Sequence, residues 1–279
     1  MADRAAPWYT SPERPVGEQS RRAGRKAYPM SGHSKWHNRI HRKSRQDAKR
    51  GALYSKLGKE ILIAARTGGG DPVSNARLKL AIERARMAGV PSDNIRRAID
   101  RGAHGDEGAN FEELSYEGYG PGGVAVLVEV QTDNRNRTAG DVRHIFSRNG
   151  GSLGEAGCVA WMFEKKGLLL IERADSDLTE ERVLEMALDA GAEDVRVESD
   201  SFAIITAPDD FDAVRQSIAA HGVRLAVAEL TMEPKSTVEV DGKDADQVAK
   251  LVETLEDHDD VSNVYTNHAE DEDLEVVEA

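Results

Sequence analysis

The chain has 279 residues, 39% of them hydrophobic, and a formal net charge of −13. This length and apolar content suit two or three small domains with buried cores, and they exclude a wholly disordered chain. There is no long apolar run, so no membrane-spanning helix is predicted. The single cysteine, Cys158, excludes an internal disulfide and fits a reducing cytoplasm.

The charge is divided unevenly along the chain. Residues 1–104 contain 23 Lys and Arg against 9 Asp and Glu, giving +14, whereas residues 105–279 contain 14 against 41, giving −27. This asymmetry predicts a polyanion-binding head on an acidic body. The alternative is that the two oppositely charged regions neutralise each other within the fold.

Residues 1–30 are rich in Arg, Pro, Ser and Gly and lack apolar periodicity. We expect either a disordered extension or residues wrongly assigned to the protein, whose true start would be Met30. Residues 31–109 are predicted to form a basic helical domain. Its apolar residues recur at helical spacing in three runs, with glycines after each run and Asp71 and Ser92 as expected N-caps. Three such helices should pack as a bundle.

From residue 110 the apolar pattern changes to a period of two and to short apolar runs, which predict strands. Strands are expected at 124–131, 157–163 and 168–173, with a helix opened by Thr138 and ending near Asn149. A second group follows, with helices at 179–190 and 209–221 and strands at 194–198, 202–207 and 224–232. A last helix at 244–256 and a strand at 261–266 precede an acidic tail, residues 268–279.

This order of elements predicts an α+β fold in which one α/β domain interrupts another. After the N-terminal three-helix domain, residues 110–175 plus 234–267 would form a ferredoxin-like split βαβ sheet. Residues 176–233 would form the inserted α/β domain. The alternative is two consecutive α/β domains, but the first would then hold three strands and one helix and leave a sheet face uncovered.

The densest positive charge lies in SGHSKWHNRIHRKSRQDAKRG, residues 31–51, with seven Lys and Arg against one acid. In an unbroken helix from Arg42, the cations at 42, 45, 49, 56 and 59 would fall within an arc of about 100° beside the apolar face. Such a stripe suits phosphates, and an interleaved tryptophan can stack on bases. The alternative is a solvated helix face. The predicted nucleic-acid contacts are Lys35, Trp36, Arg39, Arg42, Lys43, Arg45, Lys49, Arg50, Lys56 and Lys59.

The segment TDNRNRT, residues 132–138, joins a predicted strand to the following helix. Arg135 and Arg137 would lie beside the helix N-terminus, where free N–H groups and the helix dipole favour an anion. They are therefore predicted to form a second nucleic-acid contact. The alternative is a polar connection whose Asn and Thr residues simply make the turn.

Other patterns give weaker indications of chemistry. His33, His37 and His41 have a spacing that can bind zinc, but the surrounding cations oppose a metal. YEGYGPGG, residues 116–123, precedes a strand and lacks the lysine of a phosphate-binding loop, so it predicts turns. EDHDD, residues 256–260, lacks the spacing of a calcium loop and is interpreted as a solvated helix end. We predict no catalytic site, no metal and no cofactor.

Several ordered motifs resemble the YebC family. They are Gly32-His33-Ser34-Lys35-Trp36, DAKRG at 47–51, GGGDP at 68–72, YEGYGPGG at 116–123, TDNRNRT at 132–138 and FEKKG at 163–167. One stretch departs from the family, which commonly has Trp-Ala-Asn-Ile-Lys-His where this chain has Trp36-His37-Asn38-Arg39-Ile40-His41. The apolar and basic residues have exchanged places, although the cationic character is kept.

The resemblance implies a three-domain cytoplasmic protein of bacteria without enzyme activity. Members of the family are commonly assigned as DNA-binding transcriptional regulators, and relatives include a mitochondrial translational activator tied to the ribosome. We therefore expect a non-enzymatic regulator of gene expression that binds DNA. The alternatives are a translation factor that binds RNA within the ribosome, and a pure protein-interaction module. Protein partners could bind the acidic domains, and no membrane partner is expected.

Overall fold

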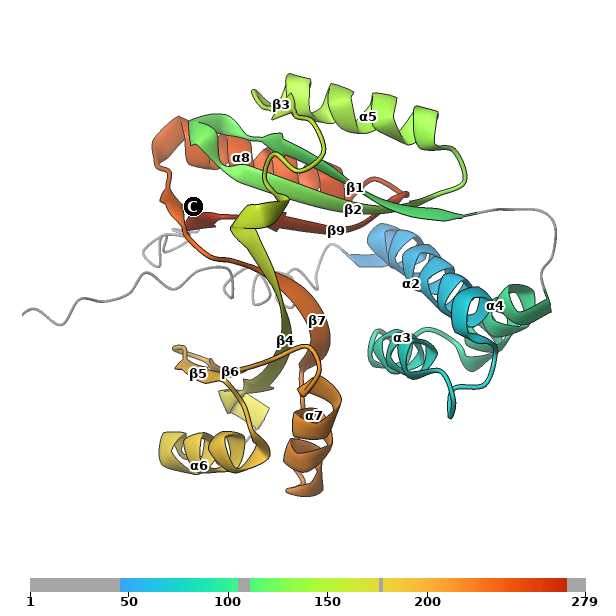
Figure 1. Ribbon diagram of the computed structural model, residues 1–279, viewed down its shortest axis with the longest axis vertical. Helices are drawn as coiled ribbons and strands as arrows, with labels where there is room; N and C mark the ends of the chain where they lie inside the picture. Colours follow the sequence, from blue (N-terminus) through green and yellow to red (C-terminus); the bar gives the residue numbers. More distant parts are fainter. Residues whose placement is uncertain (1–45, 105–110, 176–177, 270–279) are drawn as a thin grey trace, which may run out of the picture.

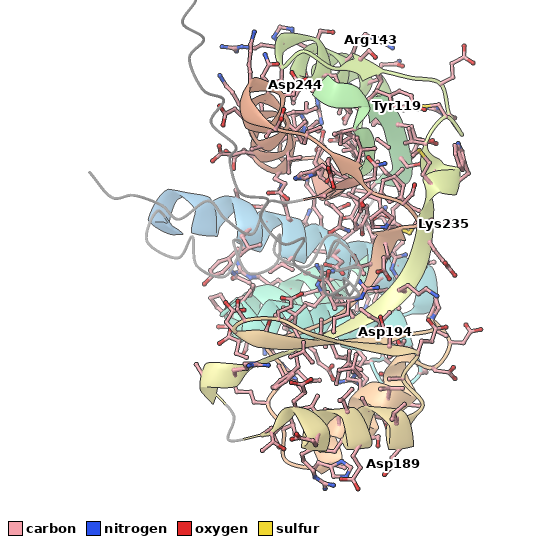
Figure 2. All side chains as sticks on the ribbon, turned by 90° about the vertical axis from the view of Figure 1, so that its left-hand side faces the viewer. Tyr119, Arg143, Asp189, Asp194, Lys235 and Asp244 are labelled. Atoms are coloured by element: carbon pink, nitrogen blue, oxygen red, sulfur yellow. The ribbon has the colours of Figure 1, made fainter. Side chains whose placement is uncertain are left out.

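The computed structural model describes residues 46–104, 111–175 and 178–269. Figure 1 shows a helical bundle at the side of two β-sheets, each with its own pair of helices. Figure 2 shows the long axis of the molecule, with Arg143 and Asp244 near one end and Asp189 near the other. Within the described part of the chain, no helix is both long enough and apolar enough to cross a membrane.

The bundle consists of α2 (Gln46–Gly68), α3 (Ala76–Met87) and α4 (Ser92–His104). Their buried apolar faces form one core that includes Ile61, Leu78 and Ile95, as the helical spacing predicts. The N-cap of α3 is Asn75, whose side chain accepts from Leu78 N and donates to Ala64 O and Gly69 O. The prediction of Asp71 as this cap is therefore wrong, and the Asn75 side chain also links the start of α3 to the end of α2.

Helix α4 continues to His104, past Gly102, which was expected to follow its end. A Cβ at this position would lie 2.4 Å from Leu62 O and 2.8 Å from the Ala65 side chain. Glycine therefore permits the close approach of α4 to α2, and it lies inside the helix instead of stopping it.

The first sheet has the strand order β3-β1-β2-β9, with every neighbouring pair antiparallel. Its strands are β1 (Glu112–Tyr119), β2 (Ala125–Thr132), β3 (Ser152–Leu153) and β9 (Val261–Thr266). Helices α5 (Arg135–Arg148) and α8 (Gly242–Glu256) cover one face (Figure 1), where Val126, Val128, Phe146 and Leu251 share a core.

The second sheet has the order β5-β6-β4-β7. It contains β4 (Phe163–Glu172), β5 (Asp194–Val197), β6 (Ser201–Thr206) and β7 (Val227–Pro234), with helices α6 (Glu180–Ala190) and α7 (Phe211–Ala220). Along the chain the elements run β-α-β-β-α-β, which is the ferredoxin-like arrangement. The prediction of this arrangement for the first sheet is wrong, because that sheet has the order β3-β1-β2-β9. The α+β class is confirmed.

The predicted placement of strand 168–173 in the first sheet is wrong, because β4 pairs with β6 and β7. The predicted division at residue 175 thus separates β4 from its own sheet. The place next to β2 is taken by β1, which the pattern did not predict because EELSYEGY contains few aliphatic residues. The chain does leave and re-enter the first sheet around the second, since β9 pairs with β2 after β7 is complete.

Smaller differences concern boundaries. Helix α5 begins at Arg135 with Asn134 as its N-cap, so the predicted Thr138 cap is wrong. The predicted strand 157–163 is a loop that ends in a short 3-10 helix, η3 (Ala160–Met162). Further 3-10 turns are η2 (Pro121–Gly123) and η4 (Arg173–Asp175). The predicted tail starts too early, because β10 (His268–Ala269) pairs with β8 (Val238–Glu239).

Candidate nucleic-acid interface

Most of the predicted basic segment lies outside the described residues. This applies to Lys35, Trp36, Arg39, Arg42, Lys43 and Arg45. Lys49 and Arg50 belong to the first turns of α2. Their role in nucleic-acid contact stays a prediction, and the described part begins where α2 enters the bundle.

The two lysines at the end of the predicted stripe contact the acidic body. Lys56 Nζ donates to the carbonyl oxygen of Glu256 at the end of α8. Lys59 Nζ donates to Asp259 O at 3.0 Å and to a carboxylate oxygen of Asp260 at 2.9 Å. For this part of the chain, the alternative of internal neutralisation therefore describes the contacts better than a free stripe.

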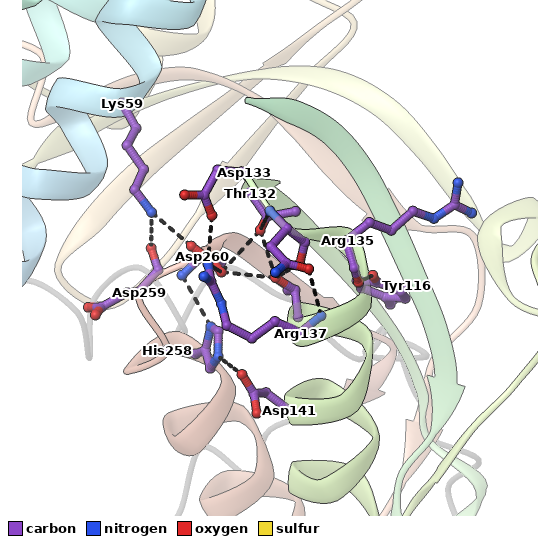
Figure 3. A network of polar contacts seen from close by, with 12 residues as sticks. Lys59, Tyr116, Thr132, Asp133, Arg135, Arg137, Asp141, His258, Asp259 and Asp260 are labelled. Carbon is purple, nitrogen blue, oxygen red and sulfur yellow. Dashed lines mark hydrogen bonds and ion pairs between the residues drawn. The ribbon is translucent and has the colours of Figure 1, made fainter. Parts of the chain in front are cut away.

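Asp260 is the centre of this junction (Figure 3), and its side chain is only 7% exposed. Besides Lys59, its carboxylate accepts from Arg137 Nη2 at 3.0 Å, and the hydroxyls of Thr132 and Thr138 lie within 3.2 and 2.9 Å. Burial alone would raise the pKa of Asp260, but the hydrogen bonds from Lys59, Arg137 and Thr138 outweigh it and hold the pKa well below its ordinary value. The interpretation of EDHDD as a solvated helix end is therefore wrong at Asp260.

His258 extends the junction to α5. Its Nδ1 accepts from the backbone N–H of Asp260 at 3.1 Å, and its Nε2 lies 3.4 Å from Asp141. These residues line an open pocket of about 550 Å³ together with Lys59 and Phe111. Among the described residues, no group of three or more His, Cys, Asp or Glu side chains is placed to hold a metal ion.

The TDNRNRT segment is largely occupied with internal contacts. Asn134 caps α5 by accepting from Arg137 N at 3.1 Å, and Arg137 pairs with Asp133 as well as Asp260. The reading of this segment as a polar connection therefore accounts for Thr132, Asn134 and Arg137. Arg135 and Arg137 are both exposed, but Arg135 points away from the Asp260 cluster (Figure 3).

More ion pairs join the bundle to the second sheet and its helix α7, and they were missed from the sequence. Arg84 of α3 lies 2.9 Å from Glu60 of α2 and 3.4 Å from Glu229 of β7. Arg215 of α7 pairs with Glu83 at 2.7 Å. Nothing in the local pattern signals these pairs, because Arg215 and Glu83 are 132 positions apart.

Helix α5 is a basic helix on the acidic body. Residues 135–148 contain four arginines and His144 against a single acid, Asp141. Arg143, His144 and Arg148 are exposed like Arg135, and Figure 2 places Arg143 at the end of the molecule. The charge run RNRTAGDVRHIFSR was visible in the sequence and could have extended the predicted contact beyond Arg137.

Comparison with known proteins decides the family. A model described as the TACO1/YebC protein N-terminal domain matches residues 34–105. A model described as the TACO1/YebC second and third domain matches residues 111–268. The chain belongs to the TACO1/YebC family. The predicted resemblance is thus confirmed, and the border between the two matches falls between the bundle and β1.

Similar members of the TACO1/YebC family carry the name "Probable transcriptional regulatory protein". One from Desulforamulus reducens is 54% identical over 242 residues, which cover 87% of this chain and all of the relative. Another from Pelotomaculum thermopropionicum is 55% identical and covers 86% of this chain and 98% of the relative. The crystal structure of a conserved hypothetical protein from Aquifex aeolicus matches with a TM-score of 0.76 and 46% identity, over 82% of this chain and 94% of that one.

Proposed function

We propose that this protein is a non-enzymatic, cytoplasmic regulator of gene expression that binds double-stranded DNA through its basic N-terminal segment. The observation that carries the proposal is the position of that segment relative to α2. Seven Lys and Arg against one acid lie in residues 31–51, and the chain runs from them directly into α2. Lys56 and Lys59 then fix α2 to the acidic body. The names of the relatives support a regulatory role.

The proposed mechanism is phosphate neutralisation. Each Lys or Arg that meets a phosphate releases condensed counterions, so affinity needs no fixed base sequence. Lys35, Arg39, Arg42, Lys43, Arg45, Lys49 and Arg50 supply this contact, with Trp36 able to stack on a base. Lys56 and Lys59 act indirectly, because they hold α2. On α5, Arg135 and Arg143 extend the duplex contact to the body, while the acidic remainder stays away from the duplex.

The second candidate is a translation factor that binds RNA within the ribosome. It is favoured by one described feature, the exposed side chain of Trp161, which is 66% exposed. Unpaired bases that stack on aromatic side chains are far more common in folded RNA than in duplex DNA. Neither candidate requires a cofactor, and in both the acidic domains remain available to a protein partner.

The test is a salt titration of binding with the full chain. Variant Arg42→Ala/Arg45→Ala/Lys49→Ala is compared with wild type on a short DNA duplex by fluorescence anisotropy. If three phosphate contacts are lost, the slope of log K against log salt should fall by about 3. A matched control is Arg182→Ala/Lys243→Ala/Lys250→Ala, which removes three exposed cations of α6 and α8.

An unchanged slope in the first variant, or an equal fall in the control, would reject the basic segment as the contact. Sedimentation of the same proteins with purified ribosomes separates the two candidates. Binding to ribosomes in preference to the duplex at equal salt would favour the translation factor. Binding to neither would reject both candidates.

A further inference from the structure

The loop between β3 and β4 is held by a buried carboxylate. Glu117 of β1 is 6% exposed and accepts from three backbone N–H groups, those of Gly157 at 2.7 Å, Val159 at 2.8 Å and Ala160 at 2.7 Å. Its backbone carbonyl accepts a fourth, from Gly154 N. Burial raises the pKa of Glu117, but these hydrogen bonds outweigh it and lower the pKa below its ordinary value. A buried charge is thus used to fix one backbone conformation.

The same loop is also packed against β2 and β7. Val159 and Phe163 are buried with Ala125 and Leu127 of β2, and Met232 of β7 packs against them. The end of the loop is therefore packed against residues of both sheets. The backbone that carries Trp161 is therefore held in one conformation by the hydrogen bonds to Glu117 and by this packing.

Trp161 lies on this loop, and Tyr119, the last residue of β1, lies beside it. Trp161 is 66% exposed and Tyr119 38%. Both donate to a single acceptor, the carbonyl oxygen of Cys158: Trp161 Nε1 at 3.1 Å and Tyr119 Oη at 3.1 Å. The two donor atoms consequently lie no more than 6.2 Å apart, which is twice 3.1 Å. Because the indole N–H is already used, the ring offers its faces to a ligand.

A cation adjoins the aromatic pair. Lys235 donates through Nζ to Trp161 O at 3.0 Å and through its backbone N–H to Met162 O at 2.9 Å. Lys235 is exposed, and Figure 2 shows it and Tyr119 along the same side of the molecule. Lys165, the third residue of β4, is also exposed. Aromatic faces beside ammonium groups are the elements of a single-strand binding surface.

We infer that Trp161, with Tyr119 and Lys235, forms a stacking site for an unpaired nucleobase of single-stranded nucleic acid. The base stacks on the indole, and Lys235 meets the neighbouring phosphate. An apolar peptide segment would need a groove instead of an oriented ring face flanked by ammonium groups. The site rests on the proposed nucleic-acid binding, but it is separate from the basic segment and reads single strands instead of duplex.

The test uses the full chain with two probes, oligouridine RNA and a short DNA duplex. Trp161→Ala should weaken binding of the RNA at least about fivefold, since a stacked base contributes about 1–3 kcal/mol. Binding of the duplex should change less than twofold. Trp161→Phe keeps a ring face and should recover most of the RNA affinity. Leu188→Ala, which removes an apolar side chain 70% exposed on α6, is the matched control and should change neither.

A second measurement covers the case in which Trp161→Ala disturbs the loop. RNA containing 4-thiouridine is cross-linked to the wild-type chain, and the cross-linked peptide should contain Trp161 or Tyr119. RNA affinity that is equal in wild type and Trp161→Ala, or cross-links confined to other peptides, would overturn the stacking site. If Trp161→Ala has no effect while Arg42→Ala/Arg45→Ala/Lys49→Ala loses the duplex, the proposed function stands without this site. If wild type binds neither probe, both proposals fail.

Discussion

Helices α2 and α5 both carry cations, but apart from Arg137, which pairs with Asp260, the cations of α5 are placed differently from Lys56 and Lys59. Lys56 and Lys59 of α2 contact the end of α8 and the loop after it. Arg143 and Arg148 of α5 are exposed. The comparison teaches that charge density along a chain does not separate cations that hold domains together from cations available to a polyanion. The partner of each cation decides which of these two uses it has, and the partners of Lys56 and Lys59 lie 200 and 201 positions away in the sequence.

The largest expected effect on stability comes from removing the carboxylate of Asp260, which binds Lys59 of α2. Asp260→Asn replaces the buried carboxylate that accepts from Lys59 and Arg137 by a neutral amide and disturbs its contacts with two threonine hydroxyls, so the free energy of unfolding should fall by about 3 kcal/mol. Urea unfolding followed by circular dichroism measures it. Asp259→Asn is the matched control, because Asp259 is exposed and accepts from Lys59 through its carbonyl oxygen only. Equal stability of Asp260→Asn and wild type would contradict the role of the junction.

Glu117→Gln should have the next largest effect. The amide places an N–H₂ group against backbone donors that now meet a carboxylate, and the loss should be about 2 kcal/mol. Glu155→Gln, in an exposed position of the same loop, should leave the free energy of unfolding unchanged within about 0.5 kcal/mol. If the loop presents Trp161 as inferred, Glu117→Gln should also lower RNA affinity while the indole is still present. No difference between the two variants would argue against the carboxylate as an anchor.

The pH dependence of stability tests the same junction at Asp260. The pKa of Asp260 is lowered in the folded protein, so its contribution is complete above its unfolded pKa of about 3.9 and is lost as pH falls below that value. The stability of wild type should therefore drop more steeply between about pH 5 and pH 3 than that of Asp260→Asn. Unfolding midpoints measured at several pH values test this expectation. Parallel curves would show that the carboxylate does not gain from its charged neighbours.

The smallest effect on stability is expected on α5. Arg143→Ala removes an exposed cation, so the free energy of unfolding should change by less than about 0.5 kcal/mol. If α5 meets phosphates, the salt slope of nucleic-acid binding should fall by about 0.9. Lys59→Ala should give the opposite result, with a clear loss of stability and no direct loss of a phosphate contact. The same behaviour in both variants would remove the distinction between α2 and α5.

The sequence predicted the parts that depend on local patterns. The three helices of the bundle follow from the spacing of residues such as Ile61 and Leu78, and the elements of the second sheet were placed within a few residues. Strand β1 was missed because its apolar content is low, and β4 was consequently assigned to the wrong sheet. Long-range pairing decides such questions, and a single sequence carries little information about it.

The candidate site was predictable only in part. The basic character of residues 31–51 is a property of the sequence, whereas the meeting of Lys59 with Asp260 joins positions 201 residues apart. The function of Glu117 was equally hidden, because a glutamate in a strand gives no sign that it binds a distant loop. Trp161 could have been singled out as a tryptophan between alanine and methionine in an apolar run, but the sequence could not show that its side chain is exposed.

The pairing of Phe163 with Pro234 has an evolutionary and practical consequence. The interrupting unit starts and finishes on neighbouring strands, and the N–H of Lys235 donates to the carbonyl oxygen of Met162 immediately outside it. Entry and exit are therefore adjacent, so a short linker would suffice to reconnect the surrounding chain. A unit attached in this manner can be inserted or removed without re-routing the chain of the first sheet.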